Sequence, residues 1–383
     1  MLHFAARLLA SALFSLVVAG IRVASVFRVG RYKSHEKMKP YRWHKVKLDR
    51  SCVCADGSKY CMYFNKGKSD NLLISFSGGG MIWDERSAQY PMGVKSYLKG
   101  VGFGYYFNRI AAFGLHPMKG IMDNRREENP FKDWSIAYIP YTTGDFHIGN
   151  AVRDIAYNGK TRRVHFNGRQ NVKAALEQVY AAFETPRKVL VCGESAGAFG
   201  SAFYVQEIAR HYEKSKVTYL CDSALIKSEK WNGILQMWGA DFQQTYGYEP
   251  GENIVKAALE DNGRQLMGRV AQLYAISLYD NVLSEFAADI NGADKKDGQY
   301  IKTWSQEMRS SVREMAERIP NFHYFISRNE YNEKDGTTPH VMARFERYYK
   351  YEEEGKRYDD WVGDAVNEQY RDIGSAYLDA DAE

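Results

Sequence analysis

From about residue 50 onward the chain alternates between short apolar runs and longer segments whose apolar residues recur every three or four positions. Short apolar runs bounded by turn residues are typical of buried strands, and the longer period is typical of amphipathic helices. The predicted strands cover residues 71–76, 134–140, 187–192, 217–222, 272–277 and 321–327. The predicted helices cover residues 171–183, 202–212 and 304–318. This alternation predicts an α/β fold with a mostly parallel central sheet and helices on both faces, of the α/β-hydrolase type.

No internal repeat and no low-complexity linker interrupts the alternation, so we expect a single catalytic domain over residues 31–383. A chain of 383 residues is long enough to bury one large core. The acidic tail, residues 352–383, is predicted to be a peripheral helix or a frayed end.

The N-terminus has a different pattern, because residues 8–21 form an unbroken run of apolar and small side chains after Arg7. The run suits the core of a signal peptide, an extension to residue 27 suits a short signal anchor, and a buried core helix is a third interpretation. We therefore assign residues 1–30 to a signal or anchor segment, with membrane association through residues 8–27. Eight cations between residues 28 and 47 follow the run. The expected location is secreted or membrane-anchored outside the cytoplasm, while this basic flank keeps a cytoplasm-facing anchor open.

Charge and cysteine content exclude several classes of protein. The net charge of +5 is small for this length, and no Lys/Arg block lies in the body of the chain, so we expect no nucleic-acid partner. Cys52, Cys54 and Cys61 cluster, but no histidine stands at ligand spacing from them, so we expect no metal and no other cofactor. One disulfide within the cluster stays open if the chain is exported.

The pentapeptide Gly-Glu-Ser-Ala-Gly at residues 193–197 stands between a predicted buried strand and a predicted helix. This is the arrangement of a nucleophile elbow, in which a tight turn projects the serine above the sheet and the glycines let strand and helix approach closely. The pattern predicts that Ser195 is a nucleophile. The alternative is an ordinary turn between strand and helix, which would not require a serine flanked by two glycines.

A serine nucleophile needs a histidine base that is oriented by a carboxylate, and in this fold both follow the serine in the chain. Downstream of Ser195 the histidines are His211, His323 and His340. His211 lies on the helix after the elbow and His323 lies inside a strand, whereas His340 follows the last strand, where the base belongs. We therefore favour His340 over His323.

Two aspartates follow later strands and are candidates for the acid. Asp280 comes after the second strand beyond the elbow, which is the usual position, and Asp222 ends the first. We favour Asp280 as the acid and expect Asp222 to brace the site through hydrogen bonds.

Three glycines at residues 78–80 directly follow a predicted strand. Backbone N–H groups on such a loop stabilise the oxyanion of an ester-cleaving serine enzyme, because residues without side chains allow a close approach. We predict an oxyanion hole made by the N–H groups of Gly79, Gly80 and Ala196. A flexible turn is the alternative for the triplet alone.

Five segments together resemble the pectin acetylesterase family, which includes Notum-type carboxylesterases. These segments are Asp-Gly-Ser at 56–58, Ser-Phe-Ser-Gly-Gly-Gly at 75–80, Asn-Pro-Phe-Lys-Asp-Trp at 129–134, Ile-Pro-Tyr-Thr-Thr-Gly-Asp-Phe-His-Ile-Gly at 139–149, and the elbow. The resemblance implies an α/β-hydrolase fold, no metal, hydrolysis of O-acyl esters, and a triad of Ser195, Asp280 and His340. Many members carry cysteine where this chain has Ile82 and Thr142, which weakens the expectation of a disulfide-braced enzyme.

Four residues near these motifs are candidates for contacting substrate: Gly78, Trp83, Asp145 and His147. Asp145 and His147 are also interpreted as braces of the loop beside the site. The sequence thus predicts a serine esterase that removes O-acyl groups, acetyl above all, from an acylated carbohydrate. The alternatives are a non-catalytic member that binds a glycan or protein, and an esterase for lipid or longer acyl substrates.

Overall fold

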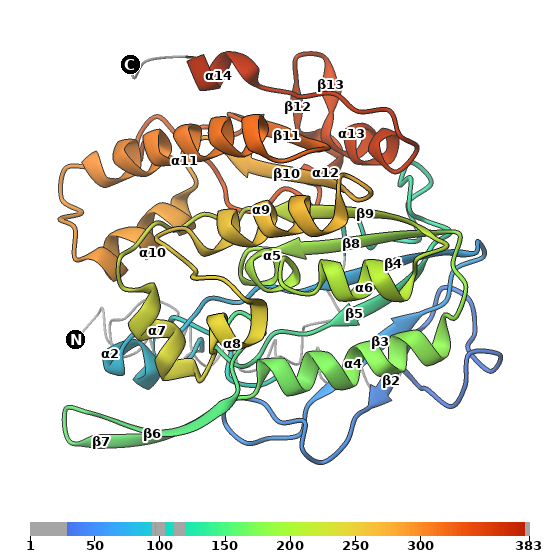
Figure 1. Cartoon of the computed structure of the whole chain (residues 1–383), viewed down its shortest axis with the longest axis horizontal. Helices are drawn as coiled ribbons and strands as arrows, with labels where there is room; N and C mark the ends of the chain where they lie inside the picture. Colours follow the sequence, from blue (N-terminus) through green and yellow to red (C-terminus); the bar gives the residue numbers. More distant parts are fainter. Residues whose placement is uncertain (1–28, 94–95, 97–103, 111–118, 380–383) are drawn as a thin grey trace, which may run out of the picture.

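The computed structural model describes residues 29–93, 96, 104–110 and 119–379. Nine strands form one sheet in the order β1-β2-β3-β5-β4-β8-β9-β10-β11 (Figure 1). The strands are β1 (Gly30–Arg31), β2 (Trp43–Lys47), β3 (Cys61–Asn65), β4 (Asn71–Phe76), β5 (Ser135–Ile139), β8 (Lys188–Glu194), β9 (Lys216–Asp222), β10 (Ala271–Ser277) and β11 (Phe322–Ser327). From β5 to β11 every neighbouring pair is parallel, whereas β3 is antiparallel to both β2 and β5.

All six predicted strands are confirmed, and the sheet is mostly parallel as the alternation predicted. Successive side chains on a strand point to opposite faces. Ile74 of β4 accordingly packs into one core and Leu73 into a second core on the other face. Both faces are buried, which explains why the central strands are apolar throughout.

Helices cover both faces of the sheet, as predicted, but unequally (Figure 1). The larger core contains residues from α4 (Gly168–Ala182), α5 (Ala196–Ser201), α6 (Val205–His211), α7 (Trp231–Trp238), α8 (Phe242–Tyr246), α9 (Ile254–Leu266), α10 (Asn281–Asn291) and α11 (Gln299–Arg318). The smaller core contains residues from α12 (Arg347–Lys350) and α13 (Tyr358–Ala365). The predicted helices 171–183, 202–212 and 304–318 correspond to α4, α6 and α11.

The sequence did not predict α9, which carries a turn-forming Asn-Gly pair in its interior. In the structure Asn262 is buried and its side-chain amide donates to the carbonyl of Ala202 at 2.9 Å. A side chain added at Gly263 would come within 2.9 Å of Ile319. Packing against neighbouring elements therefore overrides the local turn preference.

The expectation of a peripheral or frayed tail is wrong for the described part of residues 352–383. After the small hairpin of β12 (Glu352–Glu353) and β13 (Lys356–Arg357), α13 buries Trp361 and Val362 in the smaller core. Ile373 then pairs with Phe325 of β11 as an added bridge at the sheet edge. The many acidic residues of this tail made it look exposed in the sequence, although α13 carries a buried apolar face. Near the end of the chain α14 (Ser375–Asp379) follows.

One hairpin lies outside the central sheet, formed by β6 (Ala151–Tyr157) and β7 (Lys160–Phe166), and it projects from the body (Figure 1). The predicted signal or anchor segment, including residues 8–27, lies outside the described residues. Among the residues that are described, no helix has the length and apolar character needed to cross a bilayer. The five cysteines are all buried and free, so the cluster near residue 52 holds no disulfide.

Candidate active site

Ser195 occupies the sharp turn between β8 and α5 and is partly exposed. Its backbone has φ 53° and ψ −129°, a conformation that is strained for a non-glycine residue. A Cβ at Gly197 would lie 2.1 Å from the carbonyl oxygen of Phe76, and one at Gly193 would lie 2.2 Å from Ser201 Oγ. Both flanking glycines are therefore required for the close contact of strand and helix.

Asp280 and His340 are directly joined, because His340 Nδ1 lies 2.7 Å from Asp280 Oδ2. Asp280 is fully buried and caps α10, where its other oxygen accepts the N–H groups of Val282 and Leu283. These bonds keep the carboxylate fixed. His340 Nε2 is buried and has no hydrogen-bond partner among the described residues. One nitrogen of the ring is thus oriented by an acid, and the other is free to take a proton.

The segments that carry Asp280 and His340 are also bonded to each other through their backbones. Thr338 N–H donates to the Tyr279 carbonyl at 2.8 Å, and Asn281 N–H donates to the Thr338 carbonyl at 3.0 Å. The end of β10 and the loop after β11 therefore form one unit.

Asp222, the alternative acid, holds backbone rather than a histidine. Its carboxylate accepts the N–H groups of Met342 at 2.9 Å and Ala343 at 2.6 Å, and its carbonyl accepts the N–H of Ser195 at 2.8 Å. Burial raises the pKa of its carboxyl to about 6. Asp222 thereby connects the elbow to the loop that follows His340. Ser195 and His340 themselves make no hydrogen bond in the structure.

The two other downstream histidines lie elsewhere. His211 stacks on Tyr180 at the end of α6. His323 stands near the amino end of β11, where it contacts Asp372 and stacks on Tyr370. The site lies at the carboxyl ends of the strands, which excludes both as partners of Ser195.

The glycine loop after β4 runs beside the elbow. A Cβ at Gly78 would lie 2.7 Å from Ser195 Cβ, and one at Gly80 would lie 1.8 Å from the Tyr105 carbonyl oxygen. Within the described residues, the N–H groups of Gly79, Gly80 and Ala196 have no hydrogen-bond acceptor. Free donors beside the nucleophile are what an oxyanion hole requires.

Asp145 and His147 are fully buried, so their contacts are those of a brace and not of a substrate-binding surface. Asp145 accepts the Thr143 hydroxyl at 2.5 Å and the Gly168 N–H at 2.9 Å, and burial raises the pKa of its carboxyl to about 6. His147 Nε2 lies 3.1 Å from the Ser77 carbonyl and therefore donates to it. Burial lowers the pKa of His147 to about 4, so the ring is neutral at pH 7. The pair supports the base of the glycine loop.

A small apolar pocket opens beside Ser195, with a cavity volume of about 20 Å³. It is lined by Gly80, Met81, Phe146, Ser195, Ala196, Phe199, Ile226, Val282, Leu283 and Phe286. A single water needs about 10–15 Å³ on this measure, so the space suits a group of one or two heavy atoms. Trp83 is half-buried against Phe286, with ring centroids 5.5 Å apart, and stands next to this pocket.

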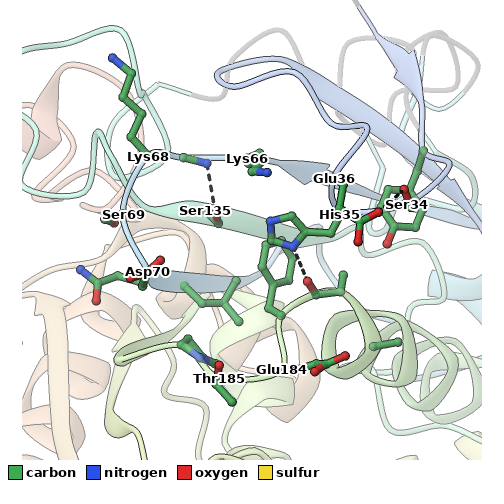
Figure 2. A pocket seen from close by; sticks show the side chains of 18 of the residues that line it. Ser34, His35, Glu36, Lys66, Lys68, Ser69, Asp70, Ser135, Glu184 and Thr185 are labelled. Atoms are coloured by element: carbon green, nitrogen blue, oxygen red, sulfur yellow. Dashed lines mark hydrogen bonds between the residues drawn. The ribbon is translucent and has the colours of Figure 1, made fainter.

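A much larger pocket of about 630 Å³ lies at the amino ends of the strands, on the opposite side of the sheet from the elbow; Figure 2 shows the side chains that line it. Its walls include Asn71, Ser135 and Pro186, at or before the amino ends of β4, β5 and β8, roughly 20 Å from the elbow along seven residues of β8. Three lysines balance three acidic side chains there: Lys33, Lys66, Lys68, Glu36, Asp70 and Glu184. Ser195 lines the smaller pocket, whereas none of Ser195, Asp280 and His340 lines the larger one.

No group of three or more His, Cys, Asp or Glu side chains within the described ranges is arranged to hold a metal ion. An open, mostly parallel sheet with helices on both faces and an elbow at the end of a central strand defines an α/β-hydrolase-type protein. A family model described as pectinacetylesterase matches residues 33–234.

This match covers more than half of the chain, which therefore belongs to the pectinacetylesterase family. Membership implies a carboxylic ester hydrolase that acts on acetyl esters. The matched range includes the glycine loop and Ser195 but ends before Asp280 and His340. No curated protein matches the chain.

Sequence reasoning missed two residues that join the site together, Glu194 and Arg344, which form an ion pair. It also missed most of the apolar pocket wall, including Phe286 of α10. A glutamate before the serine is visible in the sequence. Arg344 lies 150 residues later, and nothing in the sequence indicates that it contacts Glu194.

Proposed function

We propose that this protein is a serine carboxylesterase that removes O-acetyl groups from an acylated polysaccharide. The observation that carries the proposal is the Asp280–His340 pair, in which Nδ1 is held by the acid and the buried Nε2 has no partner among the described residues. A neutral imidazole in this state is ready to accept a proton.

In the proposed reaction, Ser195 Oγ attacks the acyl carbonyl carbon while its proton passes to His340 Nε2. Asp280 stabilises the imidazolium that forms. The N–H groups of Gly79, Gly80 and Ala196 hold the oxyanion of the tetrahedral intermediate. Collapse breaks the ester bond, and His340 returns the proton to the leaving alcohol. Water, deprotonated by His340, then attacks the acyl carbon. The bond to Ser195 Oγ breaks, His340 returns the proton to Ser195 Oγ, and the acid is released.

The narrow pocket beside Ser195 supports an acetyl group over longer acyl chains. Its volume of about 20 Å³ leaves room for a methyl group, and Leu283 and Phe286 are among the side chains that line it. A longer acyl chain would have to extend beyond this pocket. A preference for acetyl is therefore the expected specificity.

A fluorophosphonate probe tests the nucleophile. The full-length protein is expected to be labelled on Ser195, and the Ser195→Ala variant is expected to lose labelling together with hydrolysis of p-nitrophenyl acetate. Ser201→Ala is a matched control, because the Ser201 hydroxyl is buried at the far end of α5, six residues from Ser195, and donates to the Ala198 carbonyl. Equal labelling of Ser195→Ala and the parent protein would exclude the assignment.

The acyl preference is tested with p-nitrophenyl esters from acetate to palmitate. Acetate is expected to be hydrolysed best, and Phe286→Ala is expected to shift the optimum toward butyrate or hexanoate. Release of acetate from acetylated polysaccharides then tests the alcohol half of the substrate. A parent protein that prefers palmitate, or that releases no acetate from any acetylated polysaccharide, contradicts the proposal.

A further inference from the structure

The five residues 340–344, named here the base loop, include one residue in a strained conformation. Val341, directly after His340, has φ 66°, in the left-handed region that a β-branched residue rarely adopts. Such strain persists only where surrounding contacts over-determine the backbone, and it concentrates at functional sites.

Backbone contacts account for part of this restraint. Val341 N–H donates to Ser223 Oγ at 3.2 Å, and the next two N–H groups donate to Asp222. From the other side, Arg347 donates to the His340 carbonyl at 2.7 Å. These bonds fix the start and the middle of the base loop. At its end, the Ile121 N–H donates to the Ala343 carbonyl at 3.0 Å, and Arg344 pairs with Gly120 as an antiparallel bridge.

A side-chain ion pair connects the end of the base loop to the nucleophile elbow. Arg344 contacts Glu194, the residue immediately before the nucleophile. The Glu194 side chain is only 6% exposed and that of Arg344 is 22% exposed. Because desolvation offsets much of its attraction, a buried pair contributes little net stability. What this pair does is join the last residue of β8 to the base loop across 150 positions of chain.

We propose that Glu194 and Arg344 are positioning residues whose ion pair sets the separation between Ser195 Oγ and His340 Nε2. The proposal rests on the proposed function, since it assumes that these two atoms exchange a proton. Displacing a catalytic group by about 1 Å can lower a rate by roughly 100-fold. Loss of the pair should therefore reduce turnover while leaving substrate binding nearly unchanged.

The test is a double-mutant cycle on the full-length protein with Glu194→Gln, Arg344→Met and the double variant. Each single variant is expected to lower kcat for p-nitrophenyl acetate by about 10-fold to 100-fold, with KM changed less than about twofold. The double variant is expected to be no slower than the worse single variant, because both remove one interaction. Arg344→Lys, which keeps the charge but not the planar fork, should recover part of kcat.

A second half-buried pair, Lys256–Glu314 between α9 and α11, provides the control. Glu314→Gln also removes one partner of an ion pair, so it can lower the melting temperature, but it should leave kcat unchanged because it lies away from the base loop. The proposal is overturned if the Glu194 and Arg344 effects are additive, if KM rises in place of a fall in kcat, or if kcat stays within about twofold of the parent.

Loss of folding in Arg344→Met would leave the near-isosteric Glu194→Gln to decide the question. If the parent protein is neither labelled by the probe nor active, the proposed function itself fails. If the parent is active and the variants match it, only the positioning role fails.

Discussion

The described part of the chain contains two Asp–His pairs, and they differ in a way that decides which one can serve catalysis. In the Asp280–His340 pair the acid is fully buried, and the far nitrogen of the ring has no partner among the described residues. In the Asp372–His323 pair the acid is 41% exposed, and His323 Nε2 contacts Asn321 Oδ1 at 3.2 Å. An acid that is shielded from solvent holds one tautomer, whereas an exposed acid does so weakly.

The two pairs give a matched test of the acid. Asp280→Asn should lower kcat by about 10³-fold to 10⁴-fold, since an amide that presents its NH₂ group to Nδ1 favours the wrong tautomer. Asp372→Asn should leave kcat unchanged. Both are measured with p-nitrophenyl acetate at pH 7.5. A loss below about tenfold in Asp280→Asn would show that Asp280 does not orient the base.

His147 provides a prediction on stability and pH. Burial lowers its pKa from 6.5 to about 4, so the unfolded chain binds a proton that the folded chain does not between those values. Stability from this group is complete above pH 6.5 and is lost as pH falls toward 4. Gln can still donate to the Ser77 carbonyl but does not titrate, so His147→Gln should lose less stability on acidification.

The difference should be about 2–3 kcal/mol between pH 7 and pH 4.5, from roughly two pKa units at 1.36 kcal/mol each. Urea unfolding at the two pH values measures it. Asp145, whose pKa burial raises to about 6, acts in the opposite direction, since its folded state binds the extra proton. It is present in both proteins and cancels in the comparison. Equal acid sensitivity of the two proteins would contradict the assignment of His147 as a buried neutral ring.

At the scale of elements, contiguous motifs were predictable and distant contacts were not. The elbow and the glycine loop each lie within a few residues, so their backbone requirements are visible in the sequence as glycines. His340 and Asp280 were chosen as the proposed base and acid from their position after strands, and the structure brings them within 2.7 Å of each other. The Glu194–Arg344 pair and the buried stripe of α13 depend on contacts between distant segments, which one sequence does not reveal.

Two glycines have similar φ angles but different surroundings, so their substitution distinguishes a steric clash from backbone strain alone. Gly80 in the glycine loop after β4 has φ 76° and Gly159 at the β6–β7 tip has φ 70°. A Cβ at Gly80 would clash with the Tyr105 carbonyl at 1.8 Å, while one at Gly159 meets nothing within 4 Å. Gly159→Ala should therefore destabilise by only about 1–2 kcal/mol, with full activity.

Gly80→Ala must in addition displace the loop. Its kcat should fall by about 10²-fold to 10³-fold, the usual effect of losing an oxyanion donor. Urea unfolding and hydrolysis of p-nitrophenyl acetate measure the two variants side by side. Similar activity in both variants would mean that the loop tolerates movement and does not hold the oxyanion.

At the scale of the whole molecule, the site depends on both cores. The family match ends at residue 234, before Asp280, His340 and α13. The smaller core contains Met342 and Ala343 of the base loop together with Trp361 of α13. The C-terminal third of the chain therefore contains the proposed acid and base and also the packing beneath the base loop.

Trp361 tests this dependence, because it is 1% exposed, packs 5.4 Å from the Phe325 ring and donates its indole N–H to the Arg371 carbonyl at 2.7 Å. Replacing a buried tryptophan by alanine leaves a cavity, so Trp361→Ala should lower the free energy of unfolding by about 3–5 kcal/mol. Gln369→Ala, at an exposed position of the same tail, should change it by less than about 0.5 kcal/mol. Urea denaturation at pH 7 measures both. A loss below about 1 kcal/mol in Trp361→Ala would restore the interpretation of the tail as a peripheral attachment, since that is the size of an ordinary surface substitution.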